Sequence, residues 1–207
     1  MSTSRTGARL KPDQRIAALV ATARELLAEV GYERFLPAEV ARRAGVSEAT
    51  VYRYFPTKRE LLVRVAEEWL DEVLGAEPVV AHIDTTYERL SFVVRHAVGV
   101  IRKEPALTRY IFNELRPDPG FRSTAVYQLN QRIARMVGQV LRDAIASGEF
   151  RDDISIDLLR DVVFGAIEHQ AFAYLRGEGD FSIDETTEGI TRLIYRGMTP
   201  GPSDPST

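Results

Sequence analysis

The stretch GVSEATVYRYF, Gly45–Phe55, decides how the first part of this chain folds. It is too polar for a buried strand and too short for a free-standing helix, so its neighbours must stabilise it. Gly45 suits a left-handed turn, and Ser47 is a good N-cap for a helix over residues 48–54. Pro56 then ends that helix. These signals predict a short helix between two sharp breaks.

A second short helix precedes the glycine turn. Pro37 suits its first turn, and a small inner residue, Ala41, allows close packing of the helix that follows. The residues expected to point inward are Val40, Ala41, Ala44, Val46, Val51 and Phe55, and those left outside are Glu48, Ala49, Thr50, Arg53 and Tyr54. Two readings remain open. The pair is a helix-turn-helix whose outer face enters a major groove about 12 Å wide, or an ordinary helical hairpin with a solvated face.

Helices are also predicted on both sides of this pair. From residue 13 to residue 30 apolar side chains recur at threes and fours, and Gly31 provides a stop. After Pro56, Thr57 and Glu60 form a capping box that opens a fourth helix. That helix has an apolar side that includes Trp69, the only tryptophan.

Composition and charge restrict the class of protein. The chain has 207 residues, 44% hydrophobic and 28% charged, which indicates a folded globular protein. The absence of cysteine excludes disulfides and thiolate metal sites. The net charge of −3 conceals an asymmetry, because residues 1–60 carry 11 basic and 7 acidic side chains while the rest is acidic. A basic N-terminal segment followed by an acidic remainder is typical of an anion-binding module attached to a different domain. So small an excess of basic side chains can also arise by chance.

The segment VARRAGVSEATVYRYFPTKRELL, Val40–Leu62, resembles the signature of the TetR family of bacterial transcriptional regulators. The resemblance covers about residues 13–66, where spacing and residue types agree at many positions. The remainder is similar to the family only in helical layout and length. The resemblance implies an N-terminal DNA-binding domain, a homodimer and a larger domain that binds a small-molecule effector.

The resemblance also implies roles for individual residues. Arg53 would read a guanine through a bidentate contact, Tyr52 and Tyr54 would reach phosphates, and Lys58 would hold a phosphate at the start of the fourth helix. The predicted DNA-binding residues are Arg43, Ser47, Glu48, Ala49, Thr50, Tyr52, Arg53, Tyr54 and Lys58.

The second helix departs from the family pattern. Leu36, Pro37 and Ala38 stand where many members have threonine and then a basic or polar residue. The usual hydroxyl contact to phosphate is therefore missing, and affinity would depend more on Arg42, Arg43 and the basic arm. We interpret Leu36 as an apolar staple for the helix end.

The fold class expected is all-α, with about nine helices. Residues 1–12 are expected to be a disordered basic arm, 13–57 a helix-turn-helix domain, 58–199 a helical effector-binding and dimerisation domain, and 200–207 a disordered tail. The segment AEPVVAHID, 76–84, is interpreted as a linker. Helices are expected over about 85–103, 105–115, 126–147, 156–176 and 182–197.

One of these helices is apolar on every side. The segment VVFGAI, Val162–Ile167, needs cover on more than one face, which a second chain or a central place in a monomer would provide. The resemblance favours the dimer, in which the helices over 156–176 and 182–197 of each subunit form a four-helix interface. The predicted interface residues are Val162, Gly165, Ala166, Ile183, Ile190 and Ile194.

Aromatic side chains and histidines in the larger domain are candidates for an effector pocket. The candidates are Phe92, His96, Tyr110, Phe112, Tyr127, His169 and Phe172. Aromatics at helical spacing also build ordinary cores, and Glu168 and Gln170 are either polar handles or solvent-facing residues. The segments IFNELR, Ile111–Arg116, and FGAIEH, Phe164–His169, resemble members that sense fatty acyl thioesters. The effector is therefore expected to be hydrophobic, such as an acyl thioester.

The sequence contains no motif of an enzyme, a cofactor site or a metal site. The N-terminus MSTSRTGARLK has no apolar core and no stretch is long enough to span a membrane, so we expect a cytoplasmic protein without membrane partners. The favoured function is a ligand-responsive regulator that binds double-stranded operator DNA. The resemblance implies a repressor that its effector releases. The alternative is a helical ligand-binding or protein-interaction protein that keeps the fold without specific DNA binding.

Overall fold

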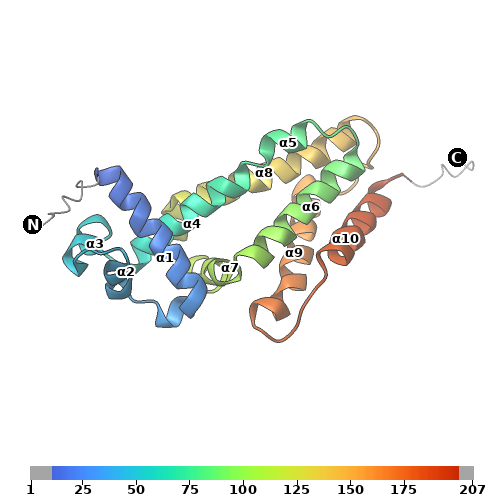
Figure 1. Cartoon of the computed structure of the whole chain (residues 1–207). Coiled ribbons are helices and arrows are strands. Elements are labelled where there is room, and N and C mark those ends of the chain that lie inside the picture. Colours follow the sequence, from blue (N-terminus) through green and yellow to red (C-terminus); the bar gives the residue numbers. More distant parts are fainter. Residues whose placement is uncertain (1–10, 201–207) are drawn as a thin grey trace, which may run out of the picture. The chain divides into compact units, whose positions relative to one another are not determined.

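The computed structural model describes residues 11–200 (Figure 1). Most of the expected basic arm and of the expected C-terminal tail lies outside these residues. The chain divides into two compact units, one ending at Glu68 and the other beginning at Trp69. The described residues form ten α-helices and no strand, which confirms the all-α class.

The first unit contains three helices and the start of a fourth. They are α1 (Pro12–Arg34), α2 (Pro37–Arg43), α3 (Glu48–Tyr54) and α4 (Lys58–Leu74). Gly31 interrupts α1 with a φ of +73°, and Gly45 has a φ of +65° between α2 and α3. Both angles lie in the left-handed region that a glycine adopts without a steric cost. Gly45 therefore follows the end of α2 as the sequence predicts, whereas Gly31, the predicted stop, kinks α1, which continues to Arg34.

The unit boundary falls inside α4 and not in front of it. The sequence analysis began the larger domain at residue 58, whereas the compact units divide between Glu68 and Trp69. Leu61, Leu62 and Ala66 on the first half of α4 are fully buried. The first half of α4 therefore completes the smaller unit, and the helix continues without a break into the second unit.

The second unit contains six further α-helices. They are α5 (Glu77–Ala81), α6 (Thr86–Lys103), α7 (Pro105–Tyr110), α8 (Ala125–Ala146), α9 (Ile156–Leu175) and α10 (Ile183–Met198). A π-helical turn, η1 (Ile111–Leu115), extends α7, and a 3₁₀ turn, η2 (Phe121–Ser123), precedes α8. α5 occupies the segment that the sequence analysis took for a linker. Pro78 lies in its first turn and Val80 is buried, so this short segment has both a helix start and an anchor.

The core of the second unit lies between α6, α8, α9 and α10. α6 packs against α8, α9 and α10, and α9 also packs against α8 and α10. Leu90, Val94, Leu141 and Val163 are all fully buried at the centre of this core. Serine or threonine caps begin the long helices, such as Ser155 on α9 and Ser182 on α10.

Candidate nucleic-acid interface and effector pocket

The recognition helix α3 is held by one cap and two buried side chains. The Ser47 hydroxyl accepts a hydrogen bond from the Thr50 backbone N–H at 3.2 Å. Val51 is 1% exposed and Phe55 7% exposed, so these residues anchor one face of the helix. Val46, expected inside, is only half-buried. The opposite face is available to a partner.

That outer face carries most of the predicted DNA-binding residues. Ser47, Glu48, Ala49, Tyr52 and Arg53 are exposed, and Thr50 and Tyr54 are half-buried. The Arg53 guanidinium carbon lies 5.0 Å from the centre of the Tyr54 ring. This contact, in which the Arg53 Nη2 also donates to the Tyr54 hydroxyl at 3.5 Å, restrains the guanidinium and leaves its other N–H donors available. The face therefore presents a planar donor that can make a bidentate contact to a guanine edge.

Lys58 makes a contact that the sequence does not reveal. Its Nζ donates to the Tyr32 carbonyl oxygen at 2.6 Å and lies 3.9 Å from the centre of the Tyr32 ring. This carbonyl belongs to the end of α1, where a cation offsets the negative end of the helix. Lys58 is half-buried and holds the end of α1. A phosphate contact by Lys58 would have to share or replace this interaction.

Arg43 lies in a cluster of ion pairs at the end of α2. Its guanidinium contacts Glu29 and Glu39, both at 2.8 Å, and Arg42 contacts Glu39 at 2.6 Å. Hydrogen bonds from Arg42 and then Arg43 lower the pKa of Glu39 to about 2. Glu39 is therefore ionised at neutral pH and offsets part of the positive charge here. Arg42, whose side chain is 72% exposed, is better placed than Arg43 to reach a phosphate.

Leu36 is not a staple. It occupies the N-cap position of α2 and is 62% exposed, with no side-chain bond to the helix start. The apolar residue that is buried before this helix is Phe35, which is fully buried. The interpretation of Leu36 was wrong because the N-cap residue turns its side chain out of the helix, and the residue before it enters the core instead.

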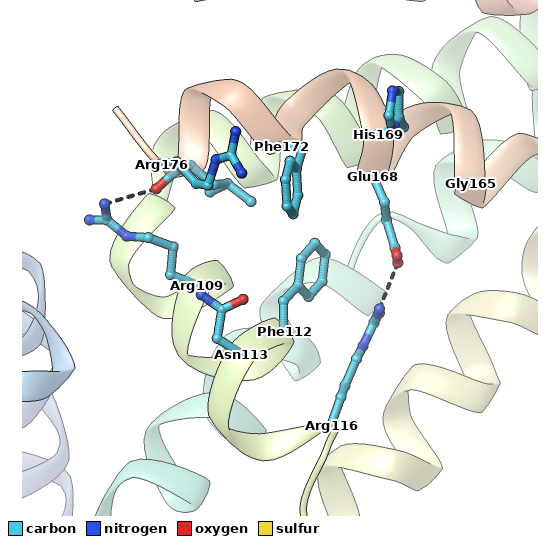
Figure 2. Close-up of a pocket in the computed structure, with 10 residues that line it drawn as sticks. Arg109, Phe112, Asn113, Arg116, Gly165, Glu168, His169, Phe172 and Arg176 are labelled. Carbon is cyan, nitrogen blue, oxygen red and sulfur yellow. Dashed lines mark hydrogen bonds and ion pairs between the residues drawn. The ribbon is translucent and has the colours of Figure 1, made fainter. Parts of the chain in front are cut away.

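Part of the predicted effector site forms a real pocket of about 540 Å³ between α7, η1 and α9 (Figure 2). Phe112, His169 and Phe172 line it, as the sequence analysis proposed for an effector site. The two phenylalanines face each other across the opening. The pocket is thus an open groove with aromatic walls.

The other four candidates lie elsewhere. Phe92 and His96 stack on each other along α6 with ring centres 6.0 Å apart, and the His96 Nε2 lies 3.1 Å from the Val73 carbonyl oxygen. Tyr110 is 2% exposed, and Tyr127 packs edge-on against Phe121. None of them lines the groove, because helical spacing brings apolar residues to a buried face without deciding which face borders a cavity.

Most of the charged lining of this groove was not predicted from the sequence. The remaining lining residues are Arg109, Asn113, Arg116, Gly165, Glu168, Leu175 and Arg176. Arg116 pairs with Glu168 at 2.7 Å, and the Arg109 Nη1 donates to the Leu175 carbonyl oxygen at 2.9 Å. A signal for these residues is present in the sequence, since positions 109, 112, 113 and 116 recur at threes and fours and so share one helix face.

The predicted dimer residues fall into two groups. On α9, Val162 is 48% exposed, Gly165 is exposed and Ala166 is half-buried. On α10, Ile194 is only 8% exposed, and Ile183 and Ile190 pack against the core of the same subunit. The apolar stripe of α10 is therefore turned towards the subunit's own core, which buries Ile194 and leaves Ile183 and Ile190 partly exposed.

Apart from Val162, the exposed apolar side chains of this unit lie outside the predicted interface set. Besides Val79 on α5, the large exposed apolar side chains here are Leu158, Val162 and Phe172 on α9, and Leu193 on α10, which is 76% exposed. With Gly165 and His169, the α9 residues recur at threes and fours along one face. We call the positions 158, 162, 165, 169 and 172 the α9 stripe. A solvent-facing row of this kind on an otherwise apolar helix marks an interaction surface.

Neither a metal centre nor a membrane span is found among residues 11–200. No group of three or more His, Asp or Glu side chains in this range is arranged to hold a metal ion. No helix there is both long and apolar enough to cross a bilayer.

An exposed recognition helix on a three-helix unit, joined by one helix to a larger helical unit, defines a helix-turn-helix DNA-binding protein with a second domain. Two family models match the chain. "Bacterial regulatory proteins, tetR family" matches residues 19–65, and "Tetracyclin repressor-like, C-terminal domain" matches residues 84–198. The chain belongs to the tetR family and is a ligand-responsive DNA-binding transcriptional regulator.

Individual relatives are distant. The fatty acid metabolism regulator protein of Bacillus subtilis is 21% identical over 181 residues, 87% of this chain and 93% of the relative. The crystal structure of FadR from Bacillus subtilis in complex with stearoyl-CoA has a TM-score of 0.76 at 21% identity and covers 88% of this chain and 98% of that one. A regulator from Saccharomonospora viridis in complex with choline has a TM-score of 0.78 at 21% identity and covers 91% and 100%. These likenesses establish the fold, and their two ligands differ in charge and in size.

Proposed function

We propose that this protein is a homodimeric repressor that binds a near-palindromic operator and is released by a small hydrophobic effector. The observation that carries the proposal is the outer face of α3, where Glu48, Ala49, Tyr52 and Arg53 are exposed around a capped and anchored helix. A two-fold axis would relate the two recognition helices, which requires two matching half-sites in the DNA.

Arg53 is proposed as the base reader, and Tyr52 and Arg42 as phosphate contacts. The Arg53 guanidinium is held by Tyr54 and has the planar geometry that matches O6 and N7 of guanine. Tyr52 is 41% exposed, so its hydroxyl can reach the DNA backbone. Lys58 is proposed to support the interface mainly by holding α1, with a phosphate contact as a second role.

The test compares Arg53→Ala and Arg53→Lys with the natural protein on operator and on random DNA. The operator is first selected from a random-sequence pool. Arg53→Ala should reduce the preference for one base pair by about 1–3 kcal/mol in fluorescence-anisotropy titrations. Arg53→Lys retains the charge and should lose the same preference while binding random DNA almost as well as the natural protein.

Equal losses on operator and random DNA for Arg53→Ala would remove Arg53 as a base reader. The alternative function, a protein of this fold without specific DNA binding, predicts no operator at all. A DNA-binding protein should be retained on heparin at low salt and released steeply as salt rises. The alternative function predicts no such salt-sensitive retention.

A second copy of the chain is the proposed partner for the first half of the α9 stripe. Leu158, Val162 and Gly165 lie exposed on one face, and Leu193 on the neighbouring helix α10 is exposed as well. Apart from its chain neighbours and the backbone of its own helix, Gly165 has no heavy atom within 4 Å of the position where a Cβ would lie, so the subunit leaves room there for close approach. Regulators of this family dimerise, which supports the same assignment.

The groove between α7, η1 and α9 is the proposed effector site. It combines facing aromatic side chains with a few polar groups, which is the usual composition of small-molecule sites. The relative from Bacillus subtilis was crystallised with stearoyl-CoA, and a hydrophobic effector such as an acyl thioester is proposed here by similarity.

A further inference from the structure

The groove between α7, η1 and α9 carries an excess of positive charge. Its lining contains the guanidinium groups of Arg109, Arg116 and Arg176 and the single carboxylate of Glu168. Two of the three arginines have carboxylate partners. Arg116 pairs with Glu168, and Arg176 pairs with Glu178, which lies just beyond the groove. Arg109 makes no ion pair with a carboxylate within the described residues; it donates to the Leu175 carbonyl oxygen.

The arginines are oriented by the aromatic walls. The Arg116 guanidinium carbon lies 4.3 Å from the centre of the Phe112 ring, and that of Arg176 lies 4.4 Å from the centre of the Phe172 ring. Stacked guanidinium groups keep their edge donors free for a planar acidic group. Figure 2 shows the two rings facing one another, with Arg109 and Arg176 at one end and the Arg116–Glu168 pair at the other.

The existing ion pairs leave part of the positive charge of the groove available to an acidic ligand. The Arg176–Glu178 pair is about half exposed on both sides, and pairs of that kind contribute little and exchange easily. The Arg116–Glu168 pair is more covered, with 30% and 37% of the two side chains exposed, so it is better suited to closing one end of the groove. Arg109 and Arg176 then form the end at which a ligand's charge would be bound.

The backbone beside the groove is irregular. The Arg116 backbone N–H donates to the Ile111 carbonyl oxygen at 2.8 Å, which is the i to i−5 bond of a π-helical turn. Such turns are rare and often occur at functional sites, because they insert one residue into a helix. Here the turn carries Phe112 and Asn113 and leads directly into Arg116, all of which line the groove.

We infer that this groove selects an amphipathic anion, whose apolar body lies between Phe112 and Phe172 and whose carboxylate or phosphate is bound by Arg109 and Arg176. This inference rests on the proposed function, because the anion is taken to be the effector that releases the repressor from DNA. An excess of guanidinium groups disfavours a cation such as choline, so the charge of the groove excludes one of the two ligand types seen in proteins of the same fold.

The test measures binding of four probes to the full-length protein by isothermal titration calorimetry. The probes are decanoate, 1-decanol, decanoyl-CoA and coenzyme A alone. Decanoate and 1-decanol share an apolar chain and differ in charge, while the two coenzyme A probes separate a phosphate head group from the chain. We expect decanoate, decanoyl-CoA or both to bind at least about tenfold more tightly than 1-decanol, because charge-assisted hydrogen bonds are the stronger class.

The double variant Arg109→Gln/Arg176→Gln should lose that preference and leave 1-decanol binding unchanged. Arg122→Gln/Arg135→Gln is the matched control, because it removes the same charge from two exposed arginines outside the groove. The control should keep the preference. Circular dichroism melting of each variant checks that it is folded, and Arg109→Lys/Arg176→Lys, which keeps the charge, should retain part of the preference.

Equal affinities for decanoate, decanoyl-CoA and 1-decanol would overturn the inference, as would the absence of binding by both acyl anions. An unchanged preference in the glutamine double variant would overturn it too. Operator release is measured separately by fluorescence anisotropy. Anions that bind without releasing operator DNA would leave the inference standing and refute the proposed effector-controlled repression.

Discussion

At the scale of single residues, three side chains make contacts that differ from those predicted from the sequence. Lys58 caps α1 through the Tyr32 carbonyl oxygen, and Arg43 is tied to Glu29 and Glu39. Leu36 is exposed at a cap position that lacks a capping side chain. Part of the positive charge of the DNA-binding unit therefore stabilises the unit itself, and the start of α2 has no side-chain cap.

Leu36→Thr should stabilise the protein by about 0.5–1 kcal/mol. Leu36 already has extended backbone angles, φ −124° and ψ 124°, so a threonine hydroxyl there could accept a backbone N–H of the first turn of α2. Urea unfolding monitored by circular dichroism measures the change. Leu36→Ala is the control and should change the unfolding free energy little, because the leucine is 62% exposed. Ser47→Ala should have the opposite effect, a loss of about 1 kcal/mol. An unchanged or lower midpoint for Leu36→Thr would show that the threonine does not cap α2.

At the scale of elements, α9 serves two surfaces at once. Val163 and Ile167 enter the core of the subunit, while the α9 stripe faces out. The first half of the stripe, Leu158 and Val162, is the proposed dimer contact, and the second half, His169 and Phe172, lines the effector groove. The two proposals therefore place the dimer contact and the effector site on neighbouring turns of one helix.

Val162→Glu should weaken the dimer at least about a hundredfold, because it buries an unpaired charge at the proposed interface. Sedimentation velocity at micromolar concentration measures the distribution of monomer and dimer. Gln128→Glu adds the same charge at an exposed position on α8 and should leave the dimer intact. A Val162→Glu protein that sediments like the natural one would exclude this face, and a natural protein that is a folded monomer would exclude the dimer itself.

At the scale of the whole molecule, α4 is the one continuous helix that runs from the first unit into the second. Lys58 starts it and Trp69, which is 7% exposed, lies where the second unit begins. Eleven residues at about 1.5 Å each separate them by roughly 16 Å along the helix axis. A change in the effector unit could therefore alter the spacing of the recognition helices through this helix.

An effector that works through α4 should change the fluorescence of Trp69. A ligand shifts an equilibrium only by its differential affinity for the two states, so saturating operator DNA must weaken effector binding by the factor by which effector weakens DNA binding. Titrations of an effector with and without operator DNA measure both factors. An effector that releases DNA with no change at Trp69 would argue against α4 as the connection. An effector whose affinity is independent of operator would rule out the two-state account.

Local signals in the sequence were sufficient for the helices and for the recognition face. The turn at Gly45, the Ser47 cap and the buried pair Val51 and Phe55 were all predicted, because each depends on residues within one or two turns of the chain. Comparable local signals predicted nearly all of the later helices, and the exception, α5, is only five residues long.

The sequence by itself thus determined the all-α class, the helix-turn-helix and the residues on its outer face, since helical periodicity and capping are properties of neighbouring residues. Only the tertiary structure decided which face of α10 is buried, which carbonyl Lys58 binds, and that Arg109, Arg116 and Arg176 line the same groove. These outcomes depend on contacts between residues far apart in the chain. Ile194 illustrates the reason. Ile194 belongs to the apolar stripe of α10, which could pack equally well against a second subunit or against the subunit's own core. The packing of α10 on α6 places it in the core.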